Sequence, residues 1–221
     1  MFNDVSRRYD FLNHFLSGGI DRRWRKRALE ILQLRAGESF LDVACGTGDL
    51  SIEAARKAPS RIVGVDFAEK MLRIFVEKKK KLDIDENIDT IQADAERLPF
   101  ADETFDVAAV AFGVRNFGNL KAGLSELYRV IRKEGRVVVL EFSKPRGLGI
   151  RQVYLLYFTR FLPVIGRLIS GDRGAYSYLP NSVMDFPDGG SFENILREAN
   201  FHDVRMTAFT FGIATAYFGR K

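Results

Sequence analysis

Two glycines and two carboxylates stand close together in one short stretch of the chain. Gly46 and Gly48 follow an apolar run that ends at Ala44, and Asp42 and Asp49 flank them. Glycines let a backbone approach a ligand closely, and the free N–H groups at a helix start can face that ligand. A strand, a glycine turn and a helix start in this order therefore predict a ligand site.

The charges around this turn restrict the kind of ligand. Ser51 stands where the dinucleotide fingerprint G-x-G-x-x-G/A has its third small residue, which weakens a nicotinamide interpretation without excluding it. Carboxylates also disfavour a nearby pyrophosphate, whereas they suit an ammonium group or hydroxyls. S-adenosylmethionine has both, so the turn favours it, although a turn of this kind alone occurs in many α/β proteins.

Acidic residues also end the next two predicted strands. Asp66 follows a strand at 61–65, about twenty residues beyond the turn, where nucleotide-binding folds place an acid that accepts hydrogen bonds from ribose hydroxyls. A helix N-cap is the structural alternative for this residue. Asp94 and Ala95 follow a strand at 89–93, where a carboxylate can accept from the amine of adenine and a backbone N–H can donate to a ring nitrogen.

Strands and helices alternate along most of the chain. Two further predicted strands, Phe105 to Phe112 and Arg136 to Phe142, are also separated by a helix, which is typical of a parallel sheet with helices on both faces. The tail differs, because Val204 to Phe211 and Ile213 to Phe218 follow each other directly. We therefore expect an α/β fold with a doubly wound, mostly parallel seven-stranded sheet and a carboxyl-terminal antiparallel hairpin. This is the architecture of class I methyltransferases.

Two segments lie outside this alternation within a chain interpreted as a single domain over 1–221. Residues 1–35 carry apolar side chains at helical spacing, so they either pack on the core as amphipathic helices or cap the glycine turn, with Tyr9 reaching it. Residues 146–190 form an apolar insertion with interspersed arginines, too short and too charged to span a bilayer. A buried lid, a dimer contact and a surface that admits a greasy substrate and touches lipid are its three interpretations.

Composition sets wider bounds. The 221 residues carry a net charge of +5, which permits an anionic partner without arguing for nucleic acid, and we expect none. A single cysteine, Cys45, excludes an internal disulfide framework. The chain opens without a signal-peptide pattern, so we expect a cytoplasmic protein, in peripheral contact with a membrane if the insertion touches lipid. No metal-ligand cluster is visible, and the lysine run 78–81 is interpreted as a solvated helix end.

The chain resembles the quinone-biosynthesis C-methyltransferases along nearly its whole length. The most specific segments read DAERLPF at Asp94 to Phe100, FGVRN at Phe112 to Asn116 and LEFSKP at Leu140 to Pro145. The resemblance implies S-adenosylmethionine-dependent C-methylation of a polyprenyl quinol, and the start of the insertion favours demethylmenaquinol over the ubiquinone precursor. It also implies that four residues contact the cofactor, namely Thr47, Asp66, Asp94 and Ala95. Family members often carry His where Asp21 stands.

This chemistry needs a group that stabilises a phenolate. A quinol ring carbon becomes a nucleophile once the neighbouring hydroxyl loses its proton, and the enzyme must align it with the donated methyl group. Arg115 is the candidate that stabilises the phenolate, and Asn116 the one that orients a hydroxyl or a water. The structural alternative for Arg115 is a salt bridge to a carboxylate such as Glu141. Alternative functions are methylation of another small molecule or RNA, and lipid binding or protein interaction without catalysis.

Overall fold

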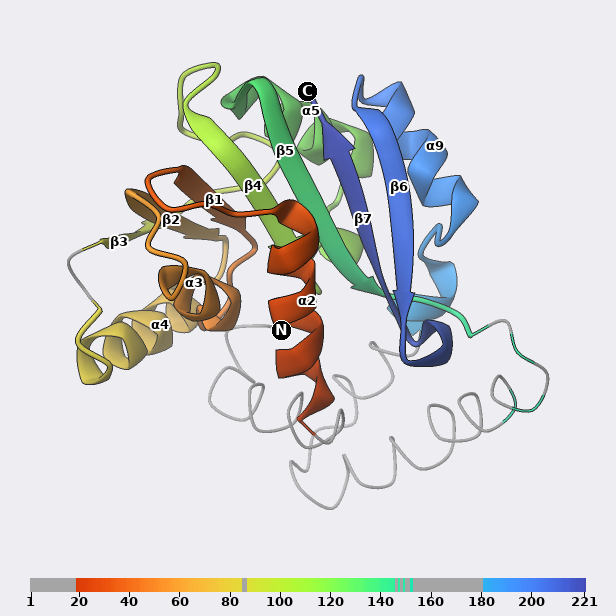
Figure 1. Cartoon of the computed structure of the whole chain (residues 1–221), viewed down its shortest axis with the longest axis horizontal. Helices are drawn as coiled ribbons and strands as arrows, with labels where there is room; N and C mark the ends of the chain where they lie inside the picture. Colours follow the sequence, from red (N-terminus) through yellow and green to blue (C-terminus); the bar gives the residue numbers. More distant parts are fainter. Residues whose placement is uncertain (1–18, 85–86, 146, 148, 150–151, 153–180) are drawn as a thin grey trace.

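One seven-stranded sheet forms the centre of the structure, a computed structural model that describes residues 19–84, 87–145, 147, 149, 152 and 181–221 (Figure 1). The strands are β1 (Ser39–Val43), β2 (Arg61–Asp66), β3 (Ile88–Gln92), β4 (Phe105–Ala111), β5 (Ile131–Phe142), β6 (His202–Phe209) and β7 (Ala214–Arg220). The helices are α2 (Ile20–Leu32), α3 (Asp49–Ala55), α4 (Glu69–Lys81), α5 (Leu120–Val130) and α9 (Gly190–Glu198), with 3₁₀ turns η1 (Val114–Asn116) and η3 (Thr210–Gly212).

The order of the strands is β3-β2-β1-β4-β5-β7-β6. The first five of these run parallel to one another, whereas β7 is antiparallel to both of its neighbours, β5 and β6. The predicted fold, including the carboxyl-terminal hairpin, is therefore confirmed. The chain order reverses between β1 and β4, and ligands of such sheets bind outside the carboxyl ends of the strands at this switch point.

Helices cover both faces of the sheet because the central strands are apolar on both faces. On one face α2, α3 and α4 pack on side chains such as Phe40 and Val138, and on the other face α5 and α9 pack on side chains such as Leu41 and Val139. Alternate residues of β1 and β5 thus enter different cores, as the period of a strand requires. The burial of these strands fixes their register, and so fixes where their carboxyl ends lie.

The strand predicted from Arg136 to Phe142 begins earlier in the structure, because β5 starts at Ile131 directly after α5. The helix ends at Val130, and Ile131 is already extended (φ −78°, ψ 139°) and paired with Phe105. The register then shifts before Val107 pairs with Arg136, which is the mark of a bulge. A Cβ on Gly135 would lie 2.7 Å from the carbonyl oxygen of Asp106, so this bulge needs a glycine.

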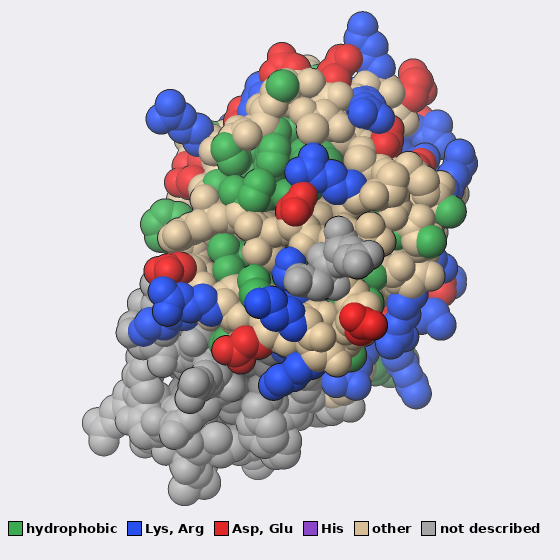
Figure 2. All heavy atoms as spheres, turned by 90° about the vertical axis from the view of Figure 1, so that its left-hand side faces the viewer, with side chains coloured by type: hydrophobic (Ala, Val, Ile, Leu, Met, Phe, Trp, Pro, Cys, Tyr) green, Lys and Arg blue, Asp and Glu red, His purple; other side chains and the backbone are tan. Residues whose placement is uncertain are grey.

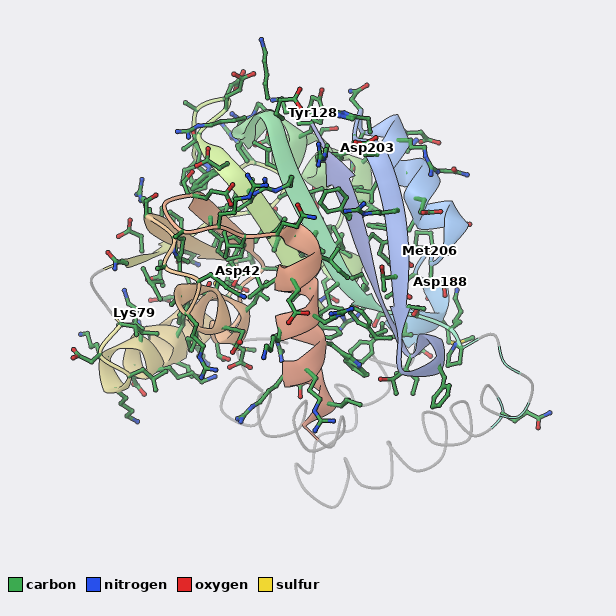
Figure 3. The ribbon with its side chains drawn as sticks, viewed as in Figure 1. Asp42, Lys79, Tyr128, Asp188, Asp203 and Met206 are labelled. Atoms are coloured by element: carbon green, nitrogen blue, oxygen red, sulfur yellow. The ribbon has the colours of Figure 1, made fainter. Side chains whose placement is uncertain are left out.

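The lysine run 78–81 is also corrected by the structure. Lys78 donates hydrogen bonds from Nζ to Thr47 Oγ1 (2.8 Å) and to Asp49 Oδ1 (3.0 Å). Lys79 is buried, and its Nζ lies 2.5 Å from the carbonyl oxygen of Ile88 (Figure 3). Two of the four lysines therefore connect α4 to neighbouring segments instead of being solvated. The helix is amphipathic, and these two side chains follow its inward face.

The segments outside the alternation are described in part. Helix α2 packs against β5 and β7, as expected of an amphipathic helix on the core. Tyr9 and most of the insertion 146–190 lie outside the described residues, so the capping and lid interpretations stay predictions. No helix among the described residues is long and apolar enough to cross a membrane. On the face that includes β3 and α4, basic side chains stand interspersed with acidic ones (Figure 2).

Candidate functional site

A cavity of about 450 Å³ lies at the carboxyl ends of β1, β2 and β4, at the switch point of the sheet. Its volume is in the range of small-molecule sites. The lining residues fall into runs at the carboxyl ends of successive strands: 42–47 and 49–50 at the end of β1, 65–68 at the end of β2, 93–96 after β3, and 111–113 with 116–118 at the end of β4. Arg25 and Met71 join them from α2 and α4.

The turn after β1 is built from backbone conformations that favour glycine. Gly46 and Gly48 have φ values of 57° and 83°, and Ala44 before them has a φ of 54°. A Cβ on Gly48 would overlap the ring of Phe75, which is fully buried beneath the turn. Gly46 lines the cavity, whereas Gly48 shapes the turn from behind it. Thr47, between them, lines the cavity and accepts the hydrogen bond of Lys78.

Asp42, labelled in Figure 3, is a buried carboxylate that lines the cavity. Its Oδ2 accepts a hydrogen bond from the Ser51 hydroxyl at 2.6 Å, whereas Oδ1 has no hydrogen-bond partner among the described residues. Burial raises the pKa of Asp42 to about 7, although Ser51 and the positive charge of Arg25 oppose the rise. A buried oxygen of this kind can accept a hydrogen bond from a cationic ligand in the cavity.

Asp66 ends β2 where the sequence predicts a ribose contact. Its Oδ2 accepts a hydrogen bond from the Gly46 N–H (2.8 Å) and its Oδ1 accepts one from the Ala68 N–H (2.8 Å). Burial raises its pKa, and these two N–H groups partly offset the rise. The carboxylate thus ties β2 to the glycine turn. Each oxygen keeps further acceptor capacity, because an ionised carboxylate accepts about four hydrogen bonds.

Asp94 and Ala95 line the cavity beyond Asp66, at the end of β3. Asp94 Oδ1 accepts a hydrogen bond from the Glu96 N–H (2.9 Å) and holds this short loop in shape. Glu96 in turn accepts from the Asn119 N–H (2.7 Å), which connects the loop to the segment after β4. The structure therefore brings Asp66, Asp94 and Ala95 to one cavity with the glycine turn.

The candidate catalytic pair lies after β4, in η1. Asn116 lines the cavity. Arg115 is not among the lining residues: its side chain is 4% exposed and forms a 2.6 Å ion pair with Glu141, which is fully buried. Arg115 also donates a hydrogen bond to the carbonyl oxygen of Phe112 (2.7 Å). The salt bridge weighed from the sequence is thus present, and the role on a phenolate stays a prediction.

Two cations near the glycine turn, Arg25 and Lys78, were not predicted as site residues from the sequence. Arg25 lines the cavity from α2, and Lys78 contacts the turn from α4. A signal for Arg25 exists, because Asp21, Trp24, Arg25, Ala28 and Leu29 share one helical face at spacings of three and four. Lys78 stands 31 residues from Thr47, and nothing local marks this contact. Tyr9 lies outside the described residues.

The described residues also bear on the metal prediction only in part. Among them, no group of three or more His, Cys, Asp and Glu side chains could hold a metal ion. The cavity carboxylates are instead occupied by backbone N–H groups, hydroxyls and basic side chains. These contacts hold the carboxylates in place, while Asp42 Oδ1 keeps no hydrogen-bond partner among the described residues.

Comparison with known proteins identifies the family of the chain. The ubiE/COQ5 methyltransferase family matches residues 1–221. The ubiquinone/menaquinone biosynthesis C-methyltransferase UbiE of Geobacter sulfurreducens is 46% identical over 223 residues, covering 100% of this chain and 87% of that protein. The demethylmenaquinone methyltransferase of Thermus thermophilus is 44% identical, with 100% of both chains covered.

A solved structure with the same fold is a SAM-dependent methyltransferase from Thermotoga maritima. It superposes with a TM-score of 0.71 at 16% identity, and the match covers 100% of this chain and 97% of that one. This likeness shows the fold alone, whereas the sequence matches show the family. The chain therefore belongs to the ubiE/COQ5 methyltransferase family and is an S-adenosylmethionine-dependent methyltransferase.

Proposed function

We propose that this methyltransferase methylates a ring carbon of a polyprenyl quinol, and that its substrate is demethylmenaquinol, which becomes menaquinol. The observation that carries the proposal is the match of the whole chain to relatives named for quinone methylation. The family-specific segments FGVRN and LEFSKP both lie at the cavity end of the sheet, directly after β4 and at the end of β5. They therefore stand beside the cofactor cavity, where an acceptor has to approach.

The residues of the cavity fit S-adenosylmethionine. The compound has an ammonium and a sulfonium group, and the cavity offers the orphaned buried oxygen of Asp42 and the carboxylate of Asp49. Its ribose carries two hydroxyls, which would donate hydrogen bonds to the Asp66 carboxylate. Asp94 with Ala95 would hold the adenine edge. When bound, it supplies an electrophilic methyl group to the acceptor. Gly46 and Thr47 would line its path along the turn.

The protein contributes orientation and charge on the acceptor side. We propose that Asn116, which lines the cavity, hydrogen-bonds the acceptor hydroxyl or the water that removes its proton. We further propose that Arg115 stabilises the phenolate that results. Because Glu141 holds its guanidinium and Phe112 accepts one of its hydrogen bonds, Arg115 also fixes the backbone of η1 that presents Asn116. These roles concern orientation and charge, which such a transfer mainly requires.

The test is methyl transfer from labelled S-adenosylmethionine to acceptors with short isoprenoid tails. We expect label in menaquinol when demethylmenaquinol is supplied, and a lower rate with the benzoquinol precursor of ubiquinone. A transfer RNA and a catechol serve as controls for other methyltransferase classes. Cofactor binding is measured separately by calorimetry. If the cofactor binds but no methyl group is transferred to either quinol, the proposed substrate is rejected and the assignment as a methyltransferase stands.

A lipophilic acceptor resides in a membrane, so we also propose peripheral membrane contact during turnover. Flotation of the protein with vesicles that contain anionic lipid, with and without short-chain quinol, measures this contact. We expect co-flotation that weakens as salt is raised, because arginines in 146–190 would meet anionic headgroups. Protein that stays in the bottom fraction under all conditions would reject the contact. Size-exclusion chromatography with light scattering would decide between a monomer and the homodimer expected as one alternative.

A further inference from the structure

The charges that line the cavity are unequal in number. Among the described lining residues one carries positive charge, Arg25, and five carry negative charge, namely Asp42, Asp49, Asp66, Asp94 and Glu96. S-adenosylmethionine has the reverse pattern, with a cationic ammonium and a cationic sulfonium against a single carboxylate. A buried carboxylate requires a cationic or hydrogen-bonding partner. Among the described lining residues, Arg25 is therefore the one whose charge is opposite to that of the cofactor's carboxylate.

Arg25 is held in place from two sides. Its guanidinium donates a hydrogen bond to Asp21, one turn earlier in α2, and lies 5.4 Å from the ring centroid of Phe112. The side chain is only 11% exposed, so its direction is set by packing. A guanidinium has five N–H donors in a fixed fork. Among the described residues, Asp21 is the one acceptor of a hydrogen bond from Arg25. Donors thus remain for a ligand.

The other end of the guanidinium faces the start of α3. Its second terminal nitrogen lies 3.8 Å from Asp49 Oδ2, a distance that leaves the ion pair without a hydrogen bond. Asp49 has a closer cation in Lys78, whose Nζ is 3.0 Å from Oδ1. Lys78 also holds Thr47 by its hydroxyl. Asp49 is therefore fixed by α4, and Arg25 is not needed to neutralise it.

We propose that Arg25 binds the carboxylate of the amino-acid end of S-adenosylmethionine, and that Asp49 receives the neighbouring ammonium. The inference rests on the proposed use of this cofactor, but on no particular acceptor. Arg25 and Asp49 then bind the two charges of one zwitterion across the same edge of the turn. A charge-assisted contact to a planar fork suits a carboxylate well, and Lys78 acts as a positioning residue that keeps Asp49 and Thr47 in place.

The experiment compares two ligands that differ only in this carboxylate: S-adenosylmethionine and its decarboxylated analogue. Their affinities are measured by calorimetry for the full chain, for Arg25→Gln and for Arg25→Lys. Lys26→Gln is the matched control, because Lys26 is the next residue on α2 and is exposed. Thermal unfolding of each variant shows whether it is folded, since Arg25→Gln removes the buried ion pair between Arg25 and Asp21.

We expect the unsubstituted chain to bind S-adenosylmethionine about 10- to 100-fold more tightly than the decarboxylated analogue. Arg25→Gln should remove most of this preference by weakening S-adenosylmethionine alone, Arg25→Lys should keep part of it, and Lys26→Gln should leave it unchanged. Equal affinities in the unsubstituted chain, or an equal loss for both ligands in Arg25→Gln, would overturn the proposal.

The comparison in the unsubstituted chain decides the question even if Arg25→Gln fails to fold. The proposed function fails in a different way, because a chain that binds neither ligand is no methyltransferase of this kind. A chain that prefers the carboxylate but transfers no methyl group to a quinol would keep Arg25 in this role and reject only the acceptor.

Discussion

Two buried arginine–carboxylate pairs share one pair of contacting aromatic rings, yet they face different surroundings. The two sets are Asp21–Arg25–Phe112 and Glu141–Arg115–Phe142, and the two ring centroids lie 4.6 Å apart. Arg25 lines the cavity, and its carboxylate partner belongs to the same helix. Arg115 does not line it, and its carboxylate partner is a fully buried residue of β5.

The difference separates two uses of one kind of contact. The Glu141 pair is closed among the described residues, since Glu141 also accepts a hydrogen bond from the backbone N–H of Phe142 (2.8 Å), and the pair joins η1 to the sheet. The Arg25 pair is open, because the guanidinium extends past Asp21 to the cavity. A buried ion pair alone therefore does not mark an active-site residue. What matters is whether donor groups remain directed at a cavity.

Breaking the closed pair should have the largest effect. Arg115→Ala leaves Glu141 buried without its counter-charge, which should lower the free energy of unfolding by about 3–5 kcal/mol in urea denaturation. Arg115→Ala combined with Glu141→Gln should be more stable than Arg115→Ala alone, because the unpaired charge is gone. A loss below about 1 kcal/mol for Arg115→Ala would mean that the pair is not closed in solution.

The folded double variant also tests the phenolate role. If Arg115 acts on the phenolate, this variant should bind S-adenosylmethionine nearly as well as the unsubstituted chain while its turnover number falls. A parallel fall of cofactor binding and turnover would assign Arg115 to structure alone. Lys133→Gln, on the exposed part of β5, is a control for the loss of a positive charge.

The second effect concerns pH on the open side. Asp42 has a pKa of about 7 in the folded chain against 3.8 when unperturbed, so the folded state binds more protons between these values. Its contribution to stability is therefore full below pH 4 and is lost as the pH rises through 7, on the order of 2–4 kcal/mol. Urea denaturation from pH 4 to 8 measures the slope. Burial shifts the pKa of Asp66 and Glu141 in the same direction.

Asp42→Asn isolates the contribution of this one carboxyl group to the pH dependence of stability. The variant should show a flatter dependence of stability on pH than the unsubstituted chain, with the difference concentrated between pH 4 and 7. The affinity for the cationic cofactor should rise through pH 7 in the unsubstituted chain and stay level in the variant. Identical pH profiles would place the pKa of Asp42 near its ordinary value.

The third effect separates the two glycines of the turn. Gly48→Ala should lower stability by about 2–3 kcal/mol, because the new methyl group overlaps the buried Phe75 ring and the backbone has a φ of 83°. Gly46→Ala meets no atom within 4 Å, so it should cost only about 1 kcal/mol of backbone strain. Thermal unfolding of both variants measures the difference. Equal losses would mean that backbone strain, not overlap, governs both positions.

The smallest effect on stability is expected at Phe67. Its side chain is 74% exposed although it lines the cavity, so Phe67→Ala should change the free energy of unfolding by less than about 0.5 kcal/mol. If its ring flanks the adenine, cofactor affinity should fall by about 5- to 50-fold. Calorimetry measures the cofactor affinity of the variant, and urea denaturation measures its stability. A variant that is destabilised but binds normally would show that Phe67 serves the fold.

Much of the fold follows from local patterns. The strand end at Phe142 and the helix start at Asp49 agree with the structure to the residue, and β2 ends at Asp66, one residue beyond the predicted strand 61–65, because an acid, a turn signal or a glycine marks each place. The start of β5 does not follow from the sequence in this way. Ile131 suits the helix that precedes it, and only its pairing with Phe105 draws it into the sheet.

The site is predictable to the extent that strand ends determine it. Asp66, Asp94 and Ala95 share a cavity because parallel strands end at one edge of a sheet. The salt bridge of Arg115 was a predicted alternative, because FGVRN and LEFSKP place an arginine and a glutamate at the ends of neighbouring strands. The contact of Lys78 with Thr47 depends on how α4 packs across the turn, which no pattern within α4 encodes.

The ring of Phe75 makes three positions dependent on one another. It lies beneath Gly48, and a Cβ on Gly64 would come within 2.8 Å of it. A larger residue at either glycine would meet the Phe75 ring, and a smaller residue at Phe75 would open space that a side chain at Gly48 or Gly64 could enter. The stability changes of substitutions at these three sites should thus be non-additive, so a change at one site is best tolerated together with a change at another.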